Sequence, residues 1–283
     1  MGLIFALLSA VFYALVFFFS KLLVTKAKYP LVIAGIFQIL AGLIFIPLFI
    51  IEPMKVYSFD FGIFLLIVLV TIVYSTFNIF SFLSNKLLDF SITGIMAQLT
   101  LIITFVGGLI IFKEQPGWLK IIGVSLILLG NISLFFKKGA KKKISFKGVV
   151  FRIIASTALG FGILIDAKNS INFSVPFYGF LTYFVSGVIT LLYARVNFTE
   201  VKLEVKNNRT GLILMALMGT FGWYFLIKSF GLIDKTVAAP LNNLSSIFMV
   251  LLGIILLKEK DRLLTKLLAA GIVFVGAVML GLA

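Results

Sequence analysis

Long apolar stretches separated by short polar joins dominate this chain of 283 residues. A helix needs about 20 apolar residues to cross the hydrocarbon core of a bilayer. Ten stretches reach roughly this length, and the period-two alternation of a membrane β-barrel is absent. The predicted spans are 2–24, 30–51, 61–83, 91–112, 118–136, 148–167, 176–194, 210–230, 236–257 and 263–282. The pattern therefore predicts an all-α integral membrane protein with ten transmembrane helices.

Composition agrees with this reading and narrows the chemistry. Hydrophobic residues make up 61% of the chain and charged residues 12%, whereas soluble domains hold about 45–50% and about 25%. The sequence has no Cys and no His, so disulfides, thiol catalysis and the commonest general base and metal ligand are excluded. A membrane-embedded enzyme would have to rely on Ser, Lys or Asp pairs, and no such motif occurs. We expect no enzyme activity, no metal and no cofactor.

The two halves of the chain repeat each other at a shift of 145 residues, with a slip to 146 near the start of each half. The matches are Gln98-Leu99-Thr100 on Asn243-Leu244-Ser245, Lys113-Glu114 on Lys258-Glu259, Asp89 on Asp234, and Pro30 on Pro176. We therefore expect a first five-helix repeat at 1–136, a Lys-rich linker loop at 137–147 and a second five-helix repeat at 148–283. Because five is odd, the second repeat would enter the membrane from the opposite side. Such inverted repeats are a recurrent transporter design with the site at their interface.

The basic residues fall unequally on the two predicted faces. The net charge is +15, and 19 of the 25 Lys and Arg lie at the face that carries the linker 137–147. The charge rule places this face in the cytoplasm, against anionic lipid headgroups, and both termini outside. No basic stripe lies on a soluble element, so we expect no nucleic-acid partner. A bacterial or archaeal cell membrane is the expected location.

Motifs near the end of each half carry a family resemblance. They read Gln98…Lys113-Glu114…Gly123…Gly130 in the first half and Pro240…Asn243…Lys258-Glu259…Gly271…Gly276 in the second. This pattern resembles the ten-helix, EamA-like branch of the drug/metabolite transporter superfamily. The resemblance implies alternating access and a central cavity lined by helices one to four and six to nine. In that family many members keep both termini in the cytoplasm, which is opposite to the charge rule here.

Two departures from a plain repeat affect the ninth and the first helices. Ile95 stands where the second half has Pro240, so only the ninth helix is predicted to carry a proline kink. Small multidrug resistance relatives use a deep first-helix Glu for proton coupling, whereas this chain has Phe12-Tyr13-Ala14 there. All carboxylates are predicted at span ends or in loops, Asp166 being nearest to an exception. We therefore expect a facilitator, or coupling through the substrate's own gradient.

Polar groups inside predicted spans are the candidates for substrate binding, because an unpaired polar group in lipid costs several kcal/mol. Repeat partners place such groups at matching depth, and a polar stripe and aromatic rings extend them. The predicted substrate-binding residues are Tyr13, Gln38, Tyr74, Asn78, Gln98, Tyr183, Trp223, Tyr224 and Asn243. Interhelical hydrogen bonds and an interfacial aromatic belt are the alternative explanations.

Charged residues near the span ends are the candidates for gates. Asp166, Lys168 and Lys228 lie toward one face, and Lys21, Lys86 and Asp89 toward the other. Each group could close one side of the cavity through a salt bridge, with Asp166 paired to Lys228. Lysines that snorkel to the interface are the alternative.

Together these features predict a secondary carrier of a small polar metabolite, an amino acid or related compound, by export or facilitated movement. The alternative is an uptake carrier for an amine such as choline, because aromatic rings bind organic cations. A channel and a membrane-embedded enzyme are remote alternatives. The expected partners are the small-molecule substrate and membrane lipid. The sequence leaves the oligomeric state open, and a monomer is compatible with it.

Overall fold

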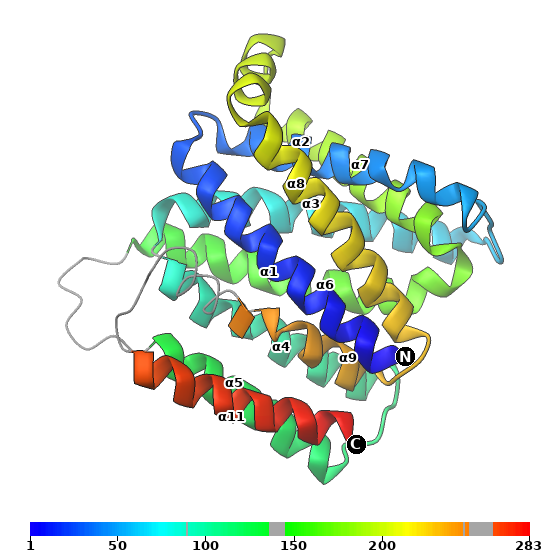
Figure 1. The fold of residues 1–283 in the computed structure, drawn as a ribbon. Coiled ribbons are helices and arrows are strands. Elements are labelled where there is room, and N and C mark those ends of the chain that lie inside the picture. The colour runs from blue at the N-terminus through cyan, green and yellow to red at the C-terminus, as the bar shows by residue number, and fades with distance from the viewer. Residues whose placement is uncertain (89, 136–144, 246, 249–262) are drawn as a thin grey trace.

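The computed structural model describes residues 1–88, 90–135, 145–245, 247–248 and 263–283 (Figure 1). In these residues the regular elements are helices, apart from an isolated antiparallel bridge between Val56 and Phe173. The α-helices are α1 (Gly2–Lys26), α2 (Pro30–Ile44), α3 (Phe61–Leu87), α4 (Phe90–Ile111), α5 (Trp118–Phe135), α6 (Phe146–Asn169), α7 (Val175–Ala194), α8 (Phe198–Phe230), α9 (Lys235–Asn242) and α11 (Leu263–Gly281). Two short 3₁₀ helices, Ile46–Ile50 and Ser170–Asn172, follow α2 and α6.

Six helices are long and apolar enough to cross a bilayer. They are α1, α2 with its 3₁₀ extension to Ile50, α3, α6 with its extension to Asn172, α7 and α8. Shorter apolar helical segments cover Met96–Ile111, Trp118–Gly130 and Gly271–Leu280 in the part of the chain that is described. These lengths confirm an all-helical integral membrane protein. The second part of the ninth predicted span, from residue 249 onward, lies outside the described residues. The presence of ten spans therefore stays a prediction.

Two boundaries differ from the sequence prediction. The α-helix of the second span ends at Ile44, and a 3₁₀ turn that includes Pro47 completes it, because proline removes a backbone donor. Helix α8 begins well before the predicted residue 210. A capping box explains this start, since Asn197 accepts from the Glu200 amide at 3.0 Å and Glu200 accepts from the Asn197 amide at 3.1 Å.

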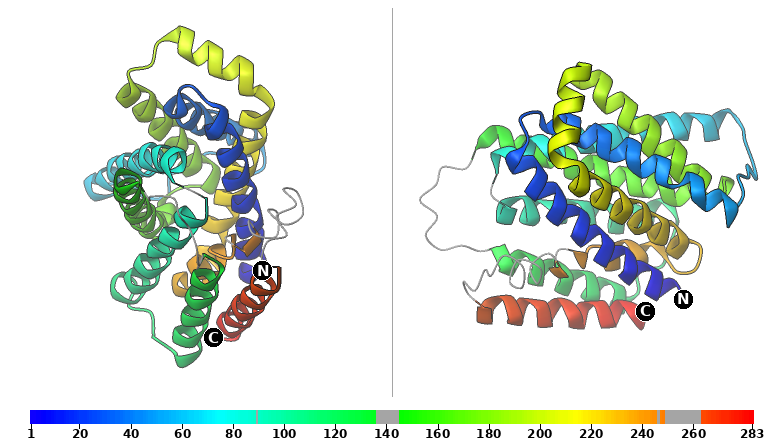
Figure 2. Two further views of the ribbon diagram at one scale, coloured as in Figure 1. Left: turned by 90° about the vertical axis from the view of Figure 1, so that its left-hand side faces the viewer. Right: turned by 45° about the horizontal axis from the view of Figure 1, so that its top comes forward.

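The first part of α8 extends past the rest of the bundle in Figure 2. Asn208 has non-helical angles within α8, with φ −127° and ψ 15°, so the helix bends there. The segment before Asn208 carries Glu200, Lys202, Glu204 and Lys206. A charged segment of this kind is stable in water or at the headgroup level rather than in hydrocarbon.

Helix directions follow from contacts between chain ends. Lys21 near the end of α1 donates to the Asn85 carbonyl near the end of α3, so α1 and α3 run the same way. Arg152 early in α6 contacts Ser81 late in α3, and Asp166 late in α6 contacts Tyr74 in the middle of α3. Helix α6, the first helix of the second half, therefore runs opposite to α1.

The halves make equivalent contacts with each other. The Ser75 hydroxyl of α3 donates to the Ser186 carbonyl of α7 at 3.1 Å. The Thr220 hydroxyl of α8 donates to the Ala41 carbonyl of α2 at 2.8 Å. Both residues of the second bond are related to those of the first by the shift of 145. The contact pairs α3–α6 and α1–α8 correspond in the same way.

Two glutamates cap the starts of α2 and α7, each from the other half of the chain. A carboxylate oxygen of Glu52, after α2, accepts from the Val175 amide at 3.1 Å. A carboxylate oxygen of Glu204, after α7, accepts from the Tyr29 amide at 2.8 Å. The first amides of a helix have no partner within it, so each half supplies a cap to the second helix of the other half.

Helices α5 and α11 form a pair at the edge of the bundle, as Figures 1 and 2 show. They approach closely because Gly123 faces Gly276. A Cβ built on Gly276 would lie 2.7 Å from the Gly123 carbonyl oxygen. Small residues at such positions let helix backbones approach in membranes.

Helix α9 is interrupted where the sequence predicted a proline kink. Pro240 lies inside the helix, and the α-helix ends at Asn242, because proline cannot donate to the preceding turn. Glu114 caps the other end by accepting from the Lys235 and Thr236 amides, both at 2.9 Å. The short helix is thus fixed at its start and broken in the interior.

Candidate functional site

A cavity lies between the two halves of the chain. About 910 Å³ of empty space lies within and in front of it, a volume that includes space open to solvent. Its polar lining residues are Tyr13, Ser20, Gln38, Tyr74, Asn78, Ser81, Thr100, Thr182, Tyr183, Asn242, Asn243 and Ser245. Its apolar lining consists of Val16, Phe17, Phe37, Phe77, Phe82, Leu159, Ile163 and Leu226. Among the lining residues that the structure describes, none is charged.

Six of the nine predicted substrate-binding residues line this cavity. They are Tyr13, Gln38, Tyr74, Asn78, Tyr183 and Asn243. Thr190 donates to the Gln38 amide oxygen at 3.4 Å, and the Asn78 amide nitrogen donates to the Tyr74 carbonyl at 2.8 Å. Each bond satisfies one hydrogen-bonding group of the side-chain amide and fixes the position of that side chain. The cavity lining includes polar residues that were not predicted as site residues: Ser20, Thr100, Thr182, Asn242 and Ser245. Ser81, from the predicted polar stripe of the third span, also lines it.

The other three predicted residues do not line the cavity. Gln98 is buried on α4, at 3% exposure. Trp223 is buried at 1% exposure next to the cavity end. Tyr224 points away, and its hydroxyl donates to Glu52 at 3.4 Å. A direct substrate contact by Trp223 or Tyr224 therefore has no geometric support in this conformation.

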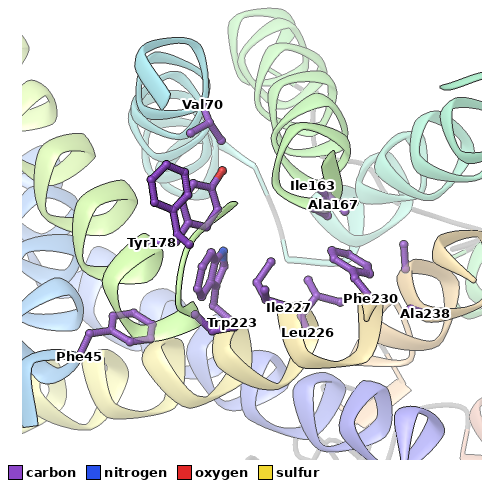
Figure 3. Packing of buried hydrophobic residues seen from close by; sticks show 13 residues of the cluster. Phe45, Val70, Ile163, Ala167, Tyr178, Trp223, Leu226, Ile227, Phe230 and Ala238 are labelled. Carbon is purple, nitrogen blue, oxygen red and sulfur yellow. The ribbon is translucent and has the colours of Figure 1, made fainter. Parts of the chain in front are cut away.

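One end of the cavity is filled by Phe45, Phe173, Tyr178 and Trp223, which we term the aromatic plug. The ring centroids of Tyr178 and Trp223 are 5.7 Å apart, and those of Phe45 and Trp223 are 5.6 Å apart. Figure 3 shows Phe45, Tyr178 and Trp223 among the surrounding aliphatic residues of the cluster. Ring pairs at this spacing attract beyond their burial alone, so the plug closes this end of the cavity.

Asp166 lies in the plug with 0% exposure. It accepts a hydrogen bond from the Tyr74 hydroxyl, one from the Tyr178 hydroxyl at 2.9 Å, and one from the Trp223 indole at 2.8 Å. Its position near the end of a span agrees with the sequence prediction, but its complete burial was not predicted. Asp166 is only three residues from the end of α6, but the segment that follows folds back over it.

Lys228 pairs with Glu52 rather than with Asp166. The Lys228 ammonium lies 2.7 Å from a Glu52 carboxylate oxygen, and both side chains are partly exposed, at 32% and 24%. The predicted Asp166–Lys228 salt bridge is wrong in this conformation, because Asp166 already has three neutral donors. Lys168 is exposed. The Glu52–Lys228 pair joins α8 to the segment after α2 at the plugged end.

The opposite end has a different set of contacts. The Lys21 ammonium donates to the Asn85 carbonyl at 3.1 Å and to the Leu88 carbonyl at 3.5 Å. A cation at the C-terminal end of a helix is favourable, so Lys21 ties α1 to α3. Lys86 is exposed, and Asp89 lies outside the described residues. A gate at this end stays a prediction.

Arg152 is a buried charge near the start of the predicted span 148–167, where the charge count placed it at the basic face. Its side chain has 5% exposure, and one guanidinium nitrogen lies 3.3 Å from the Ser81 hydroxyl oxygen. Its Nε and the Ser156 hydroxyl have no hydrogen-bond partner among the described residues. Arg152, Ser156 and Asp166 share one face of α6, at a spacing of four and then ten residues, which could have signalled their burial.

Apolar membrane helices around an uncharged polar cavity are the features of a membrane transporter. The model of the EamA-like transporter family matches the chain twice, over residues 1–136 and 146–282. The chain therefore belongs to the EamA-like transporter family, and it is a membrane transporter of the drug/metabolite type. The family consists of transporters rather than enzymes, in agreement with the sequence prediction.

The remaining comparisons concern the fold. No curated protein matches the chain. A solved structure titled "Crystal structure of protein" matches with a TM-score of 0.72 and 13% identity, over 97% of this chain and 96% of that chain. The likeness shows a shared fold over the whole chain, and the substrate has to be argued from the cavity.

Proposed function

We propose that the protein is a secondary carrier that moves a small polar metabolite by alternating access. The observation that carries the proposal is a polar, uncharged cavity between the halves that stops at the aromatic plug. A permanently open pore would need a continuous polar path, and the plug interrupts it. A closed end favours a carrier, in which the two ends open in turn.

The two halves would act as inverted five-helix repeats. Three features support this: the opposite directions of α1 and α6, the equivalent Ser75 and Thr220 bonds, and the reciprocal Glu52 and Glu204 caps. With such symmetry, a second conformation arises when each half adopts the packing that the other half has here. The plugged end would then open, and the end near Lys21 would close.

An amino acid or a related neutral or zwitterionic compound fits the lining best. Amide and hydroxyl groups of Gln38, Asn78, Asn243 and Ser81 can replace the hydrogen bonds that such a solute makes with water. The alternative is an amine such as choline. It is favoured by the rings of Tyr13, Phe17, Phe77 and Tyr183 in the lining, which can hold an organic cation by cation–π contact.

The charge rule indicates which side of the membrane the cavity faces in this conformation. The cavity lining runs from the plug toward the end that carries Lys21, which the rule places in the cytoplasm. An exporter would load its substrate in this conformation. A location in a bacterial or archaeal cell membrane, with both termini outside, is part of the same proposal.

Counterflow in liposomes tests the proposal. Purified protein is reconstituted with a trapped unlabelled solute, and uptake of the labelled solute is measured for neutral amino acids, choline and a sugar phosphate. Saturable counterflow of an amino acid or choline supports a carrier. Single-channel current without counterflow would contradict it, and a response to the sugar phosphate alone would contradict both substrate classes.

A cavity variant and a matched control make the test specific. Asn78→Ala should reduce counterflow while the protein still folds, because Asn78 lines the cavity. Thr76→Ala, two residues away on α3, should leave counterflow unchanged, because Thr76 donates to the Ile72 carbonyl of its own helix and is not among the residues that line the cavity. Equal effects from both variants would show that the cavity is not the site.

A further inference from the structure

We propose that Asp166 is a proton-binding site that couples proton movement to the opening of the plugged end. This inference rests on the proposed carrier function and replaces the expectation of a facilitator without a proton relay. It assigns Asp166 a role beyond the paired gate expected from sequence. Asp166 would be a positioning and coupling residue, and it would not contact the substrate.

The first support is the environment of the carboxylate. Asp166 has 0% exposure, and its three hydrogen-bond partners are the neutral side chains of Tyr74, Tyr178 and Trp223. None of the described Lys or Arg side chains forms an ion pair with it. Lys228, the cation on the neighbouring α8, is held by Glu52. A buried acid without a counter-ion can change its charge by gaining or losing a proton.

The second support is the direction of the hydrogen bonds. All three partners donate, and an ionised carboxylate only accepts. A proton on the carboxylate removes its charge, so charge-assisted hydrogen bonds become neutral ones, which are roughly half as strong. The tyrosine hydroxyls can turn to accept from the new O–H group, whereas the indole N–H can only donate. Protonation would therefore weaken the contacts that join α6 to α3, α7 and α8. The ionised form stabilises the closed plug, and the protonated form favours its opening.

The third support is a path from the cavity. The Tyr74 side chain lines the cavity and also donates to Asp166. The other titratable groups that face Asp166 are Tyr178 and Tyr183 of α7 and Tyr13 of α1. Helices α4 and α9 pack nearby and present no charged group to it in the part of the chain that the structure describes. One hydroxyl thus separates Asp166 from the cavity.

The fourth support is that the position equivalent to Asp166 in the first half holds a cation instead of an acid. The shift of 145 places Lys21 in the first half where Asp166 stands in the second. Lys21 donates hydrogen bonds to backbone carbonyls of α3 and the residue after it. Asp166 instead accepts hydrogen bonds, so the two residues cannot respond to a proton in the same way. Proton binding would therefore favour opening of the plugged end and not of the other end.

The proton balance of one cycle is simple. A proton leaves water on one side of the membrane, forms an O–H bond with a carboxylate oxygen of Asp166, and leaves to water on the other side after the ends exchange. No other bond forms or breaks, and no other reactant is required. If substrate binding and protonation favour opening of the same end, substrate and proton would cross the membrane in the same direction. If they favour opposite ends, the two would cross in opposite directions.

The binding step can be measured without a substrate. The chain has two tryptophans, and Trp118 is 80% exposed at the start of α5, at the edge of the bundle. A Trp118→Phe protein leaves Trp223 as the only indole, hydrogen-bonded to Asp166. We expect its fluorescence to change reversibly with pH. Addition of Asp166→Asn should abolish this change, whereas Asp234→Asn, at an exposed carboxylate, should leave it intact.

The coupling step is measured in liposomes that contain a trapped pH dye. The wild-type protein should move protons when an exchanged amino acid or choline gradient is applied. Asp166→Asn should reduce proton movement to the level of empty liposomes. Asp166→Glu should keep it, because a carboxyl group remains. Melting curves in detergent check that each variant is folded.

The outcomes separate the two proposals. Substrate counterflow in the wild type without proton movement overturns the inference and leaves the carrier standing. A pH-dependent Trp223 signal that persists in Asp166→Asn also overturns it. Absence of counterflow for every solute would contradict the carrier, even if Trp223 reports a titrating Asp166. If Asp166→Asn does not fold, Tyr74→Phe serves instead, and unchanged proton movement in that variant overturns the inference.

Discussion

The indole nitrogen of Trp223 lies 2.8 Å from a carboxylate oxygen of Asp166, so the aromatic plug is built around an acid. Burying a carboxylate is costly unless its acceptors are filled. Here Trp223, Tyr178 and Tyr74 fill them from three different helices. The closed end of the cavity therefore depends on a small set of hydrogen bonds as well as on apolar packing.

Removal of one donor should destabilise the plug. Tyr178→Phe keeps the ring and removes a hydroxyl that donates to Asp166 at 2.9 Å. A hydrogen bond to a charged group contributes about 1.5–3 kcal/mol, so the free energy of unfolding should fall by about that amount. Thermal or denaturant melting in detergent measures it. Tyr193→Phe, at an exposed tyrosine of the same helix, is the control, and an equal loss there would refute the account.

Charge reversal at Glu52 and Lys228 should separate two roles of Glu52. Lys228→Glu breaks the ion pair only, whereas Glu52→Lys also removes the acceptor of the Val175 amide. Glu52→Lys should therefore reduce transport and stability more than Lys228→Glu. The double reversal should recover the ion-pair part alone, which is about 0–1 kcal/mol for a partly exposed pair.

Full recovery in the double reversal would show that the cap on α7 is unimportant. No recovery at all would show that the pair makes no contribution to closure. Counterflow rates and melting temperatures of the four proteins supply the comparison, and exposed Lys168→Glu serves as a control for the change in net charge.

Two glycines of α11 should respond in opposite ways to alanine. At Gly276 a methyl group would lie 2.7 Å from the Gly123 carbonyl oxygen, whereas at Gly271 nothing lies within 4 Å. Gly276→Ala should cost about 1–3 kcal/mol through overpacking. Gly271→Ala should be neutral or stabilise by up to about 1 kcal/mol, because alanine is the better helix former. A Gly276→Ala protein as stable as the wild type would contradict the close approach of α5 and α11.

The Glu114 cap should control α9. Its carboxylate accepts from the Lys235 and Thr236 amides and, at 2.5 Å, from the Thr236 hydroxyl. Glu114→Gln keeps the shape but replaces one acceptor by a donor, which leaves a helix amide unsatisfied at a cost of about 1–3 kcal/mol. Transport should fall together with stability, because Asn243 directly follows α9 and lines the cavity. Backbone hydrogen exchange at Lys235 and Thr236 that stays as slow as in the wild type would argue against this role.

Patterns of apolar residues predicted the helices well because lipid imposes a length and a composition on every span. Six of the cavity residues could also be predicted, since repeat partners place Gln38, Asn78 and Asn243 at similar depth. The contacts that individual side chains make with other helices could not be predicted. Asp166 is close in sequence to a helix end, and its burial depends on Tyr74 of α3, Tyr178 of α7 and Trp223 of α8 packing around it. Glu52 reaches Lys228 across a gap of 176 residues, and no local pattern encodes such a contact.

Arg152 is a second residue whose burial was not predicted from the sequence. A cation early in a predicted span is usually an interfacial residue, because a long side chain can reach the headgroups. In this fold α3 covers it, and Ser81 is its partner. Its position on the face of α6 shared with Asp166 was visible in the sequence, but the direction of that face became clear only with the helices in place.

The central claim is that the two ends of the cavity open in turn. Because the chain has no cysteine, single cysteines can report this cleanly in membranes of known sidedness. Ser20→Cys places a thiol in the cavity lining, and Ala167→Cys places one at the closed plug. A membrane-impermeant maleimide should label residue 20 from one side only and residue 167 from the other side only, with substrate shifting the two rates in opposite directions. Labelling of both residues from the same side, or a residue 167 that stays inaccessible under every condition, would contradict alternating access.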